Sequence, residues 1–343
     1  MAALSDRAGR AGAEEVVAGL TQPSLDDVRR AAVAIAPHIS LPTPLVYSPV
    51  LSERLDAHVS LKLEFANPIG VFKLRGGVFL AGGLSDEHRR AGLVTASTGN
   101  HAQSIAYGAR LFGVPAVLFV PEGANPDKVA SIERLGGEVR RHGERFDDAR
   151  VAAEEHAAEF GMRYVHSANE PALIAGVGTA ALEVLESQQP ETDMVIVPIG
   201  GGSGAAGWLT VRDGLRHAAE VWGVQSAQAP AVHDSWRAHE VLERPNRTSA
   251  EGLATATAFG MTLDMISASL DDFVLVDDSV IEAAVVELLG AQHLLVEPAG
   301  AASLAAALAN ADRVRAKRLV LVLSGSNVTL DQLDVMLGRA TEG

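Results

Sequence analysis

Cysteine is absent from this sequence of 343 residues, which excludes disulfides, iron–sulfur clusters and metal sites built on thiolates. Aromatic residues make up only 4% of the chain, although 48% of its residues are hydrophobic. Alanine and glycine are abundant instead, which indicates helices packed closely on sheets. A chain of this length predicts two domains, or one large domain with an insertion.

Basic residues are scarce relative to acidic ones: 28 Lys and Arg against 43 Asp and Glu give a net charge of −15. This charge argues against nucleic-acid binding and against a basic membrane-binding surface. No apolar run reaches about 18 residues, so we expect no transmembrane helix. Arg7 and Arg10 precede no apolar stretch, which argues against a secretory signal, and Asp6, Glu14 and Glu15 argue against a transit peptide. We therefore expect a soluble, cytoplasmic protein.

Strand-like apolar runs alternate with segments of helical length along most of the chain. This alternation predicts an α/β fold in which parallel sheets are covered by helices on both faces. After a loose lead over residues 1–23, Ser24 is expected to cap a first helix. Strands are expected at 59–63, 93–96, 116–120, 138–142, 164–165, 194–197, 220–224, 273–276 and 319–323. Helices are expected at 46–55, from about 73, and at 100–112, 127–135, 146–160, 171–185, 279–289, 300–309 and 330–338, with one more beginning at 200–204. Residues 225–268 are less regular and suggest loops and short helices near a site.

A lysine lies where a loop becomes a helix, in the stretch from Asn67 to Gly77. Asn67-Pro68 and Gly70 are turn formers, so Lys73 should lie at the start of the helix that follows. If apolar groups surround its stem, Lys73 can lose its proton readily and form a Schiff base with an aldehyde. The alternative is an ordinary solvated lysine at a helix start.

Three further stretches join a strand to a helix or turn. Ser97 to Gln103 offers hydroxyl groups and a new helix N-terminus to an anion, typically a carboxylate, although an ordinary N-cap is the alternative. The backbone of Gly200 to Gly204 can wrap around a phosphate at the start of a helix. This stretch matches neither the dinucleotide-binding fingerprint nor a nucleotide P-loop, and a plain glycine-rich turn is the alternative. Ser324 follows the C-terminal end of a strand, which is where ligands bind in open α/β sheets. Its hydroxyl can hydrogen-bond a heterocyclic nitrogen, although an ordinary turn is the alternative.

Together these four stretches supply the groups needed to hold pyridoxal phosphate and an amino acid. From about residue 24 to the C-terminus, the chain resembles the fold-type II pyridoxal-phosphate enzymes, and most closely the serine/threonine dehydratase group. That group carries, in this order, a Ser-Phe-Lys-x-Arg-Gly segment, a Ser-x-Gly-Asn-His segment, a glycine-rich phosphate loop and a Ser-Gly-x-Asn ending. The resemblance implies a fold like the tryptophan synthase β subunit, with two doubly wound domains. The large cofactor-binding domain would comprise residues 24–74 and 166–343, and the small domain, with the Ser97–Gln103 substrate loop, residues 75–165.

The resemblance also assigns roles to individual residues. Lys73 would form the Schiff base and act as catalytic base, with Phe72 beside the cofactor ring. Asn100 would bind the 3-hydroxyl oxygen of the cofactor, and Ser324 its pyridine nitrogen. The phosphate would be held by Gly200, Gly201, Gly202, Ser203 and Gly204. The substrate carboxylate would be surrounded by Ser97, Thr98, Asn100 and His101. Glu297 matches a glutamate that lines the family's cofactor site, or it only caps a helix.

The sequence departs from the family at several positions. Val71 replaces a serine, which removes one polar group near Lys73. Thr98, the candidate catalytic residue beside Lys73, replaces the serine that acts as second catalytic base in serine racemases. It keeps the hydroxyl but adds a methyl group, so racemisation is in doubt. Gln225 and about Ala231 stand where some relatives bind a divalent cation through carboxylates, so we expect no metal.

The activity implied is β-elimination, which converts a β-hydroxy amino acid such as L-threonine or L-serine to an α-keto acid and ammonia. A neutral Ser324 at the ring nitrogen makes the cofactor a weaker electron sink, which suits elimination better than transamination. Alternatives are an amino-acid racemase, a β-replacement synthase, a dehydratase for hydroxyaspartate- or phenylserine-like substrates, and a cofactor-binding protein without catalysis. The small-molecule substrate is expected to be the only partner apart from a second copy of the chain, since family members are commonly dimers.

Overall fold

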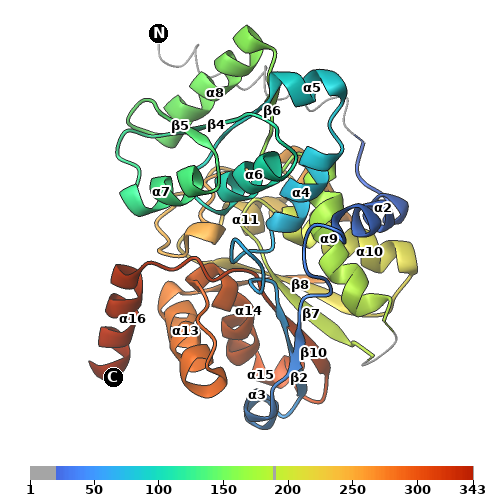
Figure 1. Ribbon diagram of the computed structural model, residues 1–343. Coiled ribbons are helices and arrows are strands. Elements are labelled where there is room, and N and C mark those ends of the chain that lie inside the picture. The colour runs from blue at the N-terminus through green and yellow to red at the C-terminus, as the bar shows by residue number, and fades with distance from the viewer. Residues whose placement is uncertain (1–20, 188–190, 343) are drawn as a thin grey trace.

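The computed structural model describes residues 21–187 and 191–342, and two sheets organise this part of the chain (Figure 1). The larger sheet contains β1 (Leu45–Tyr47), β2 (His58–Leu63), β7 (Met194–Pro198), β8 (Glu220–Ser226), β9 (Asp272–Val276) and β10 (Arg318–Leu323). The smaller sheet contains β3 (Leu93–Ala96), β4 (Ala116–Val120), β5 (Glu138–Arg141) and β6 (Arg163–Tyr164). The strand orders are β1-β2-β10-β7-β8-β9 and β5-β4-β3-β6. Apart from the antiparallel β1–β2 pair, neighbouring strands run parallel, which confirms the predicted fold class.

Helices connect the strands and cover both sheets. They are α2 (Leu25–Ile35), α3 (Pro49–Leu55), α4 (Leu74–Gly82), α5 (Asp86–Ala91), α6 (Asn100–Leu111), α7 (Pro126–Arg134), α8 (Phe146–Phe160), α9 (Pro171–Leu185), α10 (Ser203–Leu215), α11 (Ala231–Ala238), α12 (Gly260–Ser269), α13 (Asp278–Gln292), α14 (Pro298–Ala309), α15 (Ala311–Val314) and α16 (Leu330–Glu342), with a 3₁₀ turn η1 at Glu251–Leu253. None of the helices in the described part of the chain is long and apolar enough to span a membrane.

Most of the predicted elements are confirmed within a few residues, including the helix capped by Ser24. The helix predicted at 46–55 is wrong in its first part, because Leu45–Tyr47 pairs with β2 as an edge strand and the helix begins only at Pro49. The irregular stretch 225–268 contains α11, η1 and α12. The first 20 residues of the lead expected at 1–23 lie outside the described part.

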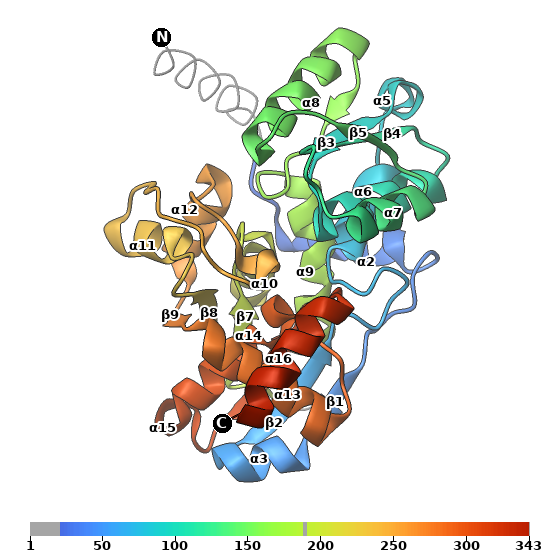
Figure 2. The same ribbon diagram turned by 90° about the vertical axis from the view of Figure 1, so that its left-hand side faces the viewer.

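Alternate residues of the central strands point to opposite faces of the larger sheet. On β10, Leu319, Leu321 and Leu323 pack with α3, α13 and α14, whereas Val320 and Val322 pack with α2, α9 and α10. This is the pattern of a parallel strand buried on both faces. Figure 2 shows α13 and α14 on one side of the sheet and α10 on the other.

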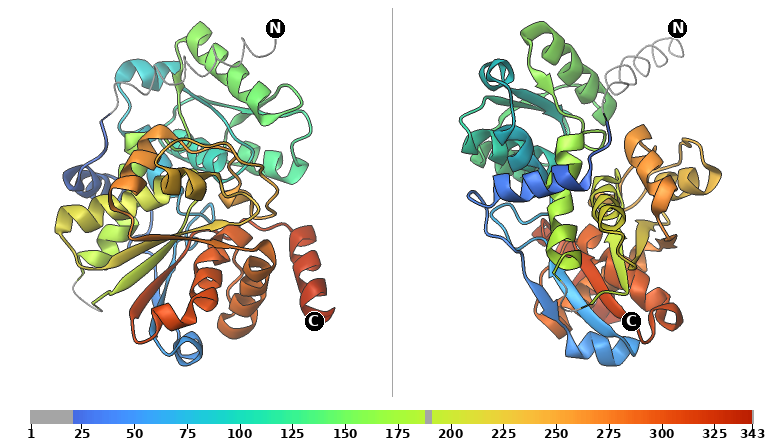
Figure 3. Two further views of the ribbon diagram at one scale, coloured as in Figure 1. Left: turned by 180° about the vertical axis from the view of Figure 1, so that it is seen from behind. Right: turned by 90° about the vertical axis from the view of Figure 1, so that its right-hand side faces the viewer.

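The smaller sheet is likewise covered on both faces. Leu93 and Leu118 pack with α4 and α6, and Val94 and Val117 pack with α8. The two sheets lie one above the other, with α9 running down from the junction beside the larger sheet (Figures 1 and 3). The carboxyl ends of β2, β3, β7 and β10 therefore lead into loops near this junction, which is where the four stretches singled out from the sequence lie.

Candidate active site

The loop before Lys73 is held in shape by Asn67. Its Oδ1 accepts hydrogen bonds from the backbone N–H groups of Ile69 (3.1 Å) and Val71 (3.4 Å). Its Nδ2 donates to the carbonyl oxygens of Glu64 (2.7 Å) and Val71 (3.0 Å). These bonds close the turn predicted from the sequence and place Lys73 as the N-cap residue of α4.

The glycine pair after Lys73 lets α4 lie very close to its neighbours. A Cβ atom on Gly76 would lie 2.9 Å from the carbonyl oxygen of Leu173 on α9, and one on Gly77 would lie 2.3 Å from that of Ser104 on α6. The Ser104 hydroxyl donates to the carbonyl oxygen of Lys73 at 2.5 Å. The backbone of Lys73 is thus fixed from both sides.

The segment after β10 pairs with the lysine loop. The backbone N–H of Phe72 donates to the carbonyl oxygen of Ser324 (3.0 Å), and that of Ser326 donates to the carbonyl oxygen of Gly70 (2.9 Å). Between them, Val71 and Gly325 form an isolated antiparallel bridge. Two of the predicted stretches, about 250 residues apart in the sequence, therefore lie side by side.

The Lys73 side chain lies among apolar groups and hydroxyls. Its Nζ is 5.1 Å from the centre of the Phe72 ring and 3.5 Å from Ser203 Oγ. Lys73, His101, Ser104, Leu173, Val177 and Ser203 line a small cavity. Burial lowers the pKa of Lys73 to about 8, although the negative charge of Glu297 opposes this shift. Much more of this amine is therefore neutral near physiological pH than of a lysine with the ordinary pKa of 10.5, and the neutral form is the nucleophile and base.

The glycine-rich stretch forms a closely walled cradle at the start of α10. Gly202 has a φ of +92°, which favours glycine. A Cβ on Gly200 would lie 2.2 Å from the carbonyl oxygen of Gly252, and one on Gly204 would lie 3.3 Å from the Phe72 ring. Because the first N–H groups of a helix have no acceptor within it, α10 offers donors to an anion held in this cradle.

The substrate loop predicted at Ser97–Gln103 connects β3 to α6. Ser97 Oγ accepts the backbone N–H of Gly99 (3.2 Å), and α6 begins at Asn100. Asn100 Nδ2 donates to Glu297 Oε1 at 2.8 Å. Ser97 and Thr98 are half-buried. The loop therefore presents hydroxyl groups and a helix N-terminus close to Glu297, on the same side as Lys73.

The His101 imidazole is turned toward the smaller sheet. Thr95 Oγ1 donates to the carbonyl oxygen of Val165 at 2.7 Å, so it accepts from His101 Nε2 at 3.0 Å. Burial, followed by the positive charge of Lys73, lowers the pKa of His101 to about 3. His101 is therefore neutral, and its one ring N–H is already donated to Thr95, so its side chain offers a substrate carboxylate neither a positive charge nor a hydrogen bond.

Glu297, whose role the sequence left open, contacts the site directly. It is buried, and burial raises its pKa to about 7, against the hydrogen bond from Asn100 and the charges of Lys128 and Lys73. Its Oε1 lies so close to Gly325 that a Cβ there would be only 2.1 Å away. Glu297 thus links the helix that begins at Pro298 to Asn100.

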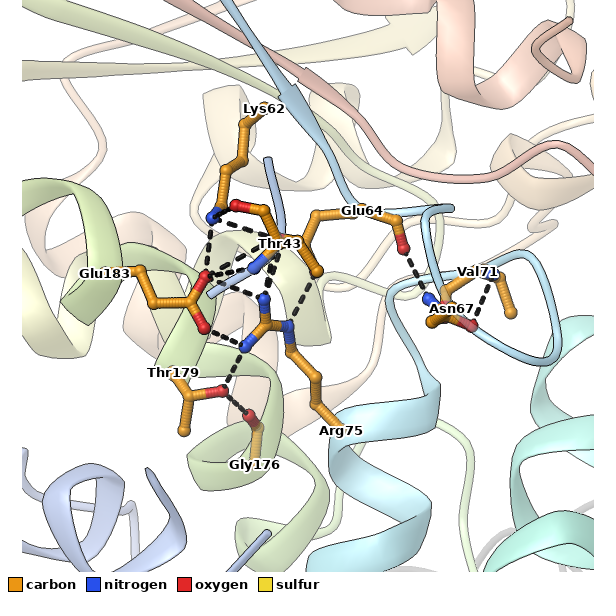
Figure 4. Close-up of polar contacts among 9 residues, drawn as sticks. All are labelled: Thr43, Lys62, Glu64, Asn67, Val71, Arg75, Gly176, Thr179 and Glu183. Carbon is orange, nitrogen blue, oxygen red and sulfur yellow. Dashed lines mark hydrogen bonds and ion pairs between the residues drawn. The ribbon is translucent and has the colours of Figure 1, made fainter. Parts of the chain in front are cut away.

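A buried ion cluster beneath the lysine loop was missed from the sequence (Figure 4). It is formed by Lys62, Glu64, Arg75 and Glu183, with the hydroxyls of Thr43 and Thr179. Arg75 donates to both carboxylates, at 2.7 Å to Glu64 Oε2 and 2.7 Å to Glu183 Oε1. The signal was present: β2 alternates, with Val59, Leu61 and Leu63 on one face, and Ser60, Lys62 and, just beyond the strand, Glu64 on the other.

Gln225, expected to replace a metal-binding carboxylate, is fully buried and makes local bonds. Its amide donates to Thr255 Oγ1 (3.3 Å) and accepts the backbone N–H of His233 (3.1 Å). Within residues 21–187 and 191–342, no group of three or more His, Cys, Asp or Glu side chains is arranged to hold a metal ion.

The site fits pyridoxal phosphate, the cofactor implied by the resemblance, on two observations. Burial lowers the pKa of the Lys73 amine to about 8, which favours its reaction with an aldehyde. The cradle at Gly200–Gly204 is so closely walled that a Cβ on Gly200 or on Gly202 would collide with neighbouring atoms, while the start of α10 favours an anion there.

Comparison with known proteins also indicates an enzyme that uses pyridoxal phosphate. The family described as "Pyridoxal-phosphate dependent enzyme" matches residues 38–325. An L-threonine ammonia-lyase of Thermotoga maritima is 34% identical over 92% of this chain and 78% of its own length. One of Geobacter sulfurreducens is 37% identical over 87% of this chain and 74% of its own. Among solved structures, maize serine racemase superposes with a TM-score of 0.87 at 29% identity, covering 94% of this chain and 99% of the racemase chain.

Proposed function

The chain belongs to the pyridoxal-phosphate-dependent enzyme family, and on this premise we propose that it is an ammonia-lyase that dehydrates and deaminates L-threonine or L-serine. The observation that carries the proposal is the partly neutral amine of Lys73, which lines one small cavity with Ser203 of the glycine cradle and His101 of the substrate loop. The relatives named L-threonine ammonia-lyase support the choice of substrate.

In this proposal, the amine of Lys73 would hold the cofactor through its aldehyde carbon. Gly200 to Gly204 would hold its phosphate, Ser324 its ring nitrogen and Asn100 its ring oxygen. When bound, pyridoxal phosphate withdraws electrons from Cα and so makes the Cα proton acidic. The Lys73 amine then removes that proton, for which a pKa of about 8 is well suited.

The remaining groups bind and orient the substrate. The hydroxyls and helix N-terminus of the Ser97–His101 stretch hold its carboxylate. The β-hydroxyl leaves as water, and hydrolysis of the released unsaturated amine then gives the α-keto acid and ammonia. The hydroxyl of Ser324 brings no charge to the ring nitrogen, which favours loss of the β-hydroxyl over longer-lived charge at Cα.

Racemisation is the second candidate, because the fold superposes on maize serine racemase with a TM-score of 0.87. It requires a proton donor or acceptor on each face of Cα. Thr98 is the residue available opposite Lys73 by the resemblance, and its extra methyl group restricts the rotamers of its hydroxyl. We therefore favour elimination.

We further propose that residues 75–165 form the small domain and that residues 24–74 and 166–343 form the large one. The support is that all strands of the smaller sheet fall between Leu93 and Tyr164. The absence of cysteine suits the reducing cytoplasm. A homodimer is proposed by the resemblance alone, and light scattering of the purified protein tests it.

The experiment is to incubate the cofactor-loaded protein with L-threonine and with L-serine and to analyse the products. Elimination gives a keto acid and ammonia, racemisation gives the D-amino acid, and a binding protein gives neither. Lys73→Ala should abolish turnover and the adduct that borohydride fixes to the wild type. Wild-type turnover by this variant would refute the assignment of Lys73.

A further inference from the structure

The side-chain amide of Asn327 connects the two loops that flank the site. Asn327 follows β10, three residues after Ser324. Its Nδ2 donates to the carbonyl oxygen of Ile69 in the lysine loop (3.0 Å) and to Asn100 Oδ1 in the substrate loop (2.8 Å). An amide nitrogen has two hydrogens, so these two bonds use the whole donor capacity of Asn327.

The partners of Asn327 and Asn100 determine which atom of each amide donates and which accepts. The Ile69 carbonyl can only accept, so the amide nitrogen of Asn327 must face it. The same nitrogen then requires an acceptor on Asn100, which must turn Oδ1 toward it. Independently, Asn100 donates through Nδ2 to the carboxylate oxygen Glu297 Oε1 at 2.8 Å, and in its ionised form a carboxylate also only accepts. The Ile69 carbonyl therefore requires this orientation of the Asn100 amide, and the bond to ionised Glu297 agrees with it.

Asn327 is itself held firmly. The neighbouring Ser326 donates its backbone N–H to the carbonyl oxygen of Gly70 at 2.9 Å. Gly70 has a φ of +67°, and a Cβ there would lie 3.1 Å from Asn327 Oδ1, so the lysine loop packs directly against the amide. A side chain supported in this way can orient its neighbour at little entropic cost.

We propose that Asn327 is a positioning residue that keeps the N–H edge of Asn100 turned toward the cofactor site. This inference rests on the proposed function, in which Asn100 faces the ring oxygen of pyridoxal phosphate. An N–H donor there stabilises that oxygen in its ionised form, whereas the amide oxygen of a reversed Asn100 would repel it. Asn327 thus acts on the cofactor through Asn100 without touching it.

The test measures the dissociation constant of pyridoxal phosphate and the visible absorption spectrum of the bound cofactor. The proteins are the wild type, Asn327→Ala, Asn327→Asp, Asn100→Ala and the double variant Asn100→Ala/Asn327→Ala. Ser326→Ala is the matched control, because Ser326 contacts the same lysine loop but not Asn100. Urea unfolding of each apo-protein reports folding separately.

We expect Asn327→Ala to weaken cofactor binding about tenfold, the effect of one hydrogen bond to a charged group, and to shift the absorption toward shorter wavelength. Asn327→Asp should weaken it further, because a carboxylate attracts Asn100 Nδ2 and so reverses the amide. In the Asn100→Ala background, removal of Asn327 should change the constant less than about twofold, since the effect passes through Asn100. Ser326→Ala should resemble the wild type.

Two results would overturn the inference. If Asn327→Ala weakens binding equally in both backgrounds, Asn327 acts through the lysine loop alone. If it changes neither the constant nor the spectrum, it positions nothing of consequence. A wild type that binds no pyridoxal phosphate would instead refute the proposed function, and with it the premise of this inference.

Discussion

Replacing Arg75 by methionine should strongly destabilise the protein, because Arg75 balances the charge of the ion cluster under the lysine loop (Figure 4). Arg75 and Lys62 face the carboxylates of Glu64 and Glu183, so the cluster carries two charges of each sign. Arg75 and Glu64 are almost completely buried, with 2% and 1% of their side chains exposed. Water therefore cannot replace the lost guanidinium.

The magnitude follows from what the substitution leaves behind. Two buried carboxylates would share one cation, Lys62, which lies 2.5 Å from Glu183 but 3.9 Å from Glu64. Breaking a buried ion pair from one side costs about 3–5 kcal/mol, a large part of the roughly 5–15 kcal/mol that stabilises a typical protein. Arg75→Met should therefore lower the free energy of unfolding by about 3–5 kcal/mol.

A second substitution separates charge balance from lost packing. Arg75→Met/Glu64→Gln keeps the close Lys62–Glu183 pair and removes the uncompensated charge. The double variant should be about 2 kcal/mol more stable than Arg75→Met, because the effects of residues in one network are not additive. The assay is urea denaturation of the apo-proteins, with unfolding monitored by tryptophan fluorescence and circular dichroism.

The pH dependence gives an independent check. Burial raises the pKa of Glu183, but the hydrogen bonds and charges of Arg75 and Lys62 outweigh this, so its folded pKa lies below the ordinary value of 4.5. In the wild type this stabilisation is present above pH 4.5 and is lost as pH falls through the folded value. Without Arg75, the effect of burial dominates and raises the pKa of Glu183. The loss of unfolding free energy in Arg75→Met should therefore become smaller as the pH is lowered from 7 to about 5. A variant within about 1 kcal/mol of the wild type, or no rescue by Glu64→Gln, would refute the reasoning.

Three further predictions concern the site. The rate at which the apo-protein binds pyridoxal phosphate, measured by absorbance, should rise with pH and level off above about pH 8, because the pKa of Lys73 is lowered to about 8. If Lys73 had the ordinary pKa of 10.5, the rate would keep rising above pH 8. Activity should survive EDTA within about twofold, since the neutral amide of Gln225 cannot replace a carboxylate ligand; a large loss restored by magnesium or calcium would contradict this. Thr98→Ser should raise the ratio of D-amino acid to keto acid, measured by chiral chromatography. Thr98→Ala should keep most of the keto-acid formation. A wild type that makes mostly D-amino acid would instead show that Thr98 is an acid–base catalyst.

Local patterns were sufficient to predict most of the fold. The apolar run around Leu321 and the helix capped by Ser24 follow from hydrophobic periodicity and capping, which act within a few residues. The edge strand at Leu45–Tyr47 could not be found in this way, because its ladder is formed with Ser60–Lys62. Tertiary pairing overrides local propensity there.

For the site, the sequence identified the loops but not their mutual contacts. Lys73 and the glycine cradle were predicted from turn chemistry, and the structure places Lys73 Nζ 3.5 Å from Ser203 Oγ. The Arg75–Glu183 bond and the Asn100–Asn327 bond join residues more than 100 positions apart, and no local pattern encodes such pairs. The inward turn of His101 was also inaccessible, because it depends on Val165.

The position of β10 has a consequence for how the protein is made. The last strand of the chain is inserted between β2 and β7, and the segment after it pairs with the lysine loop. While a ribosome is still translating the chain, the larger sheet has a gap at its centre, and the facing edges of β2 and β7 lack their neighbour. The lysine loop can therefore gain its partner segment only once residues 324–327 have left the ribosome. Until then the backbone N–H and C=O groups along the facing edges of β2 and β7 have no strand to pair with.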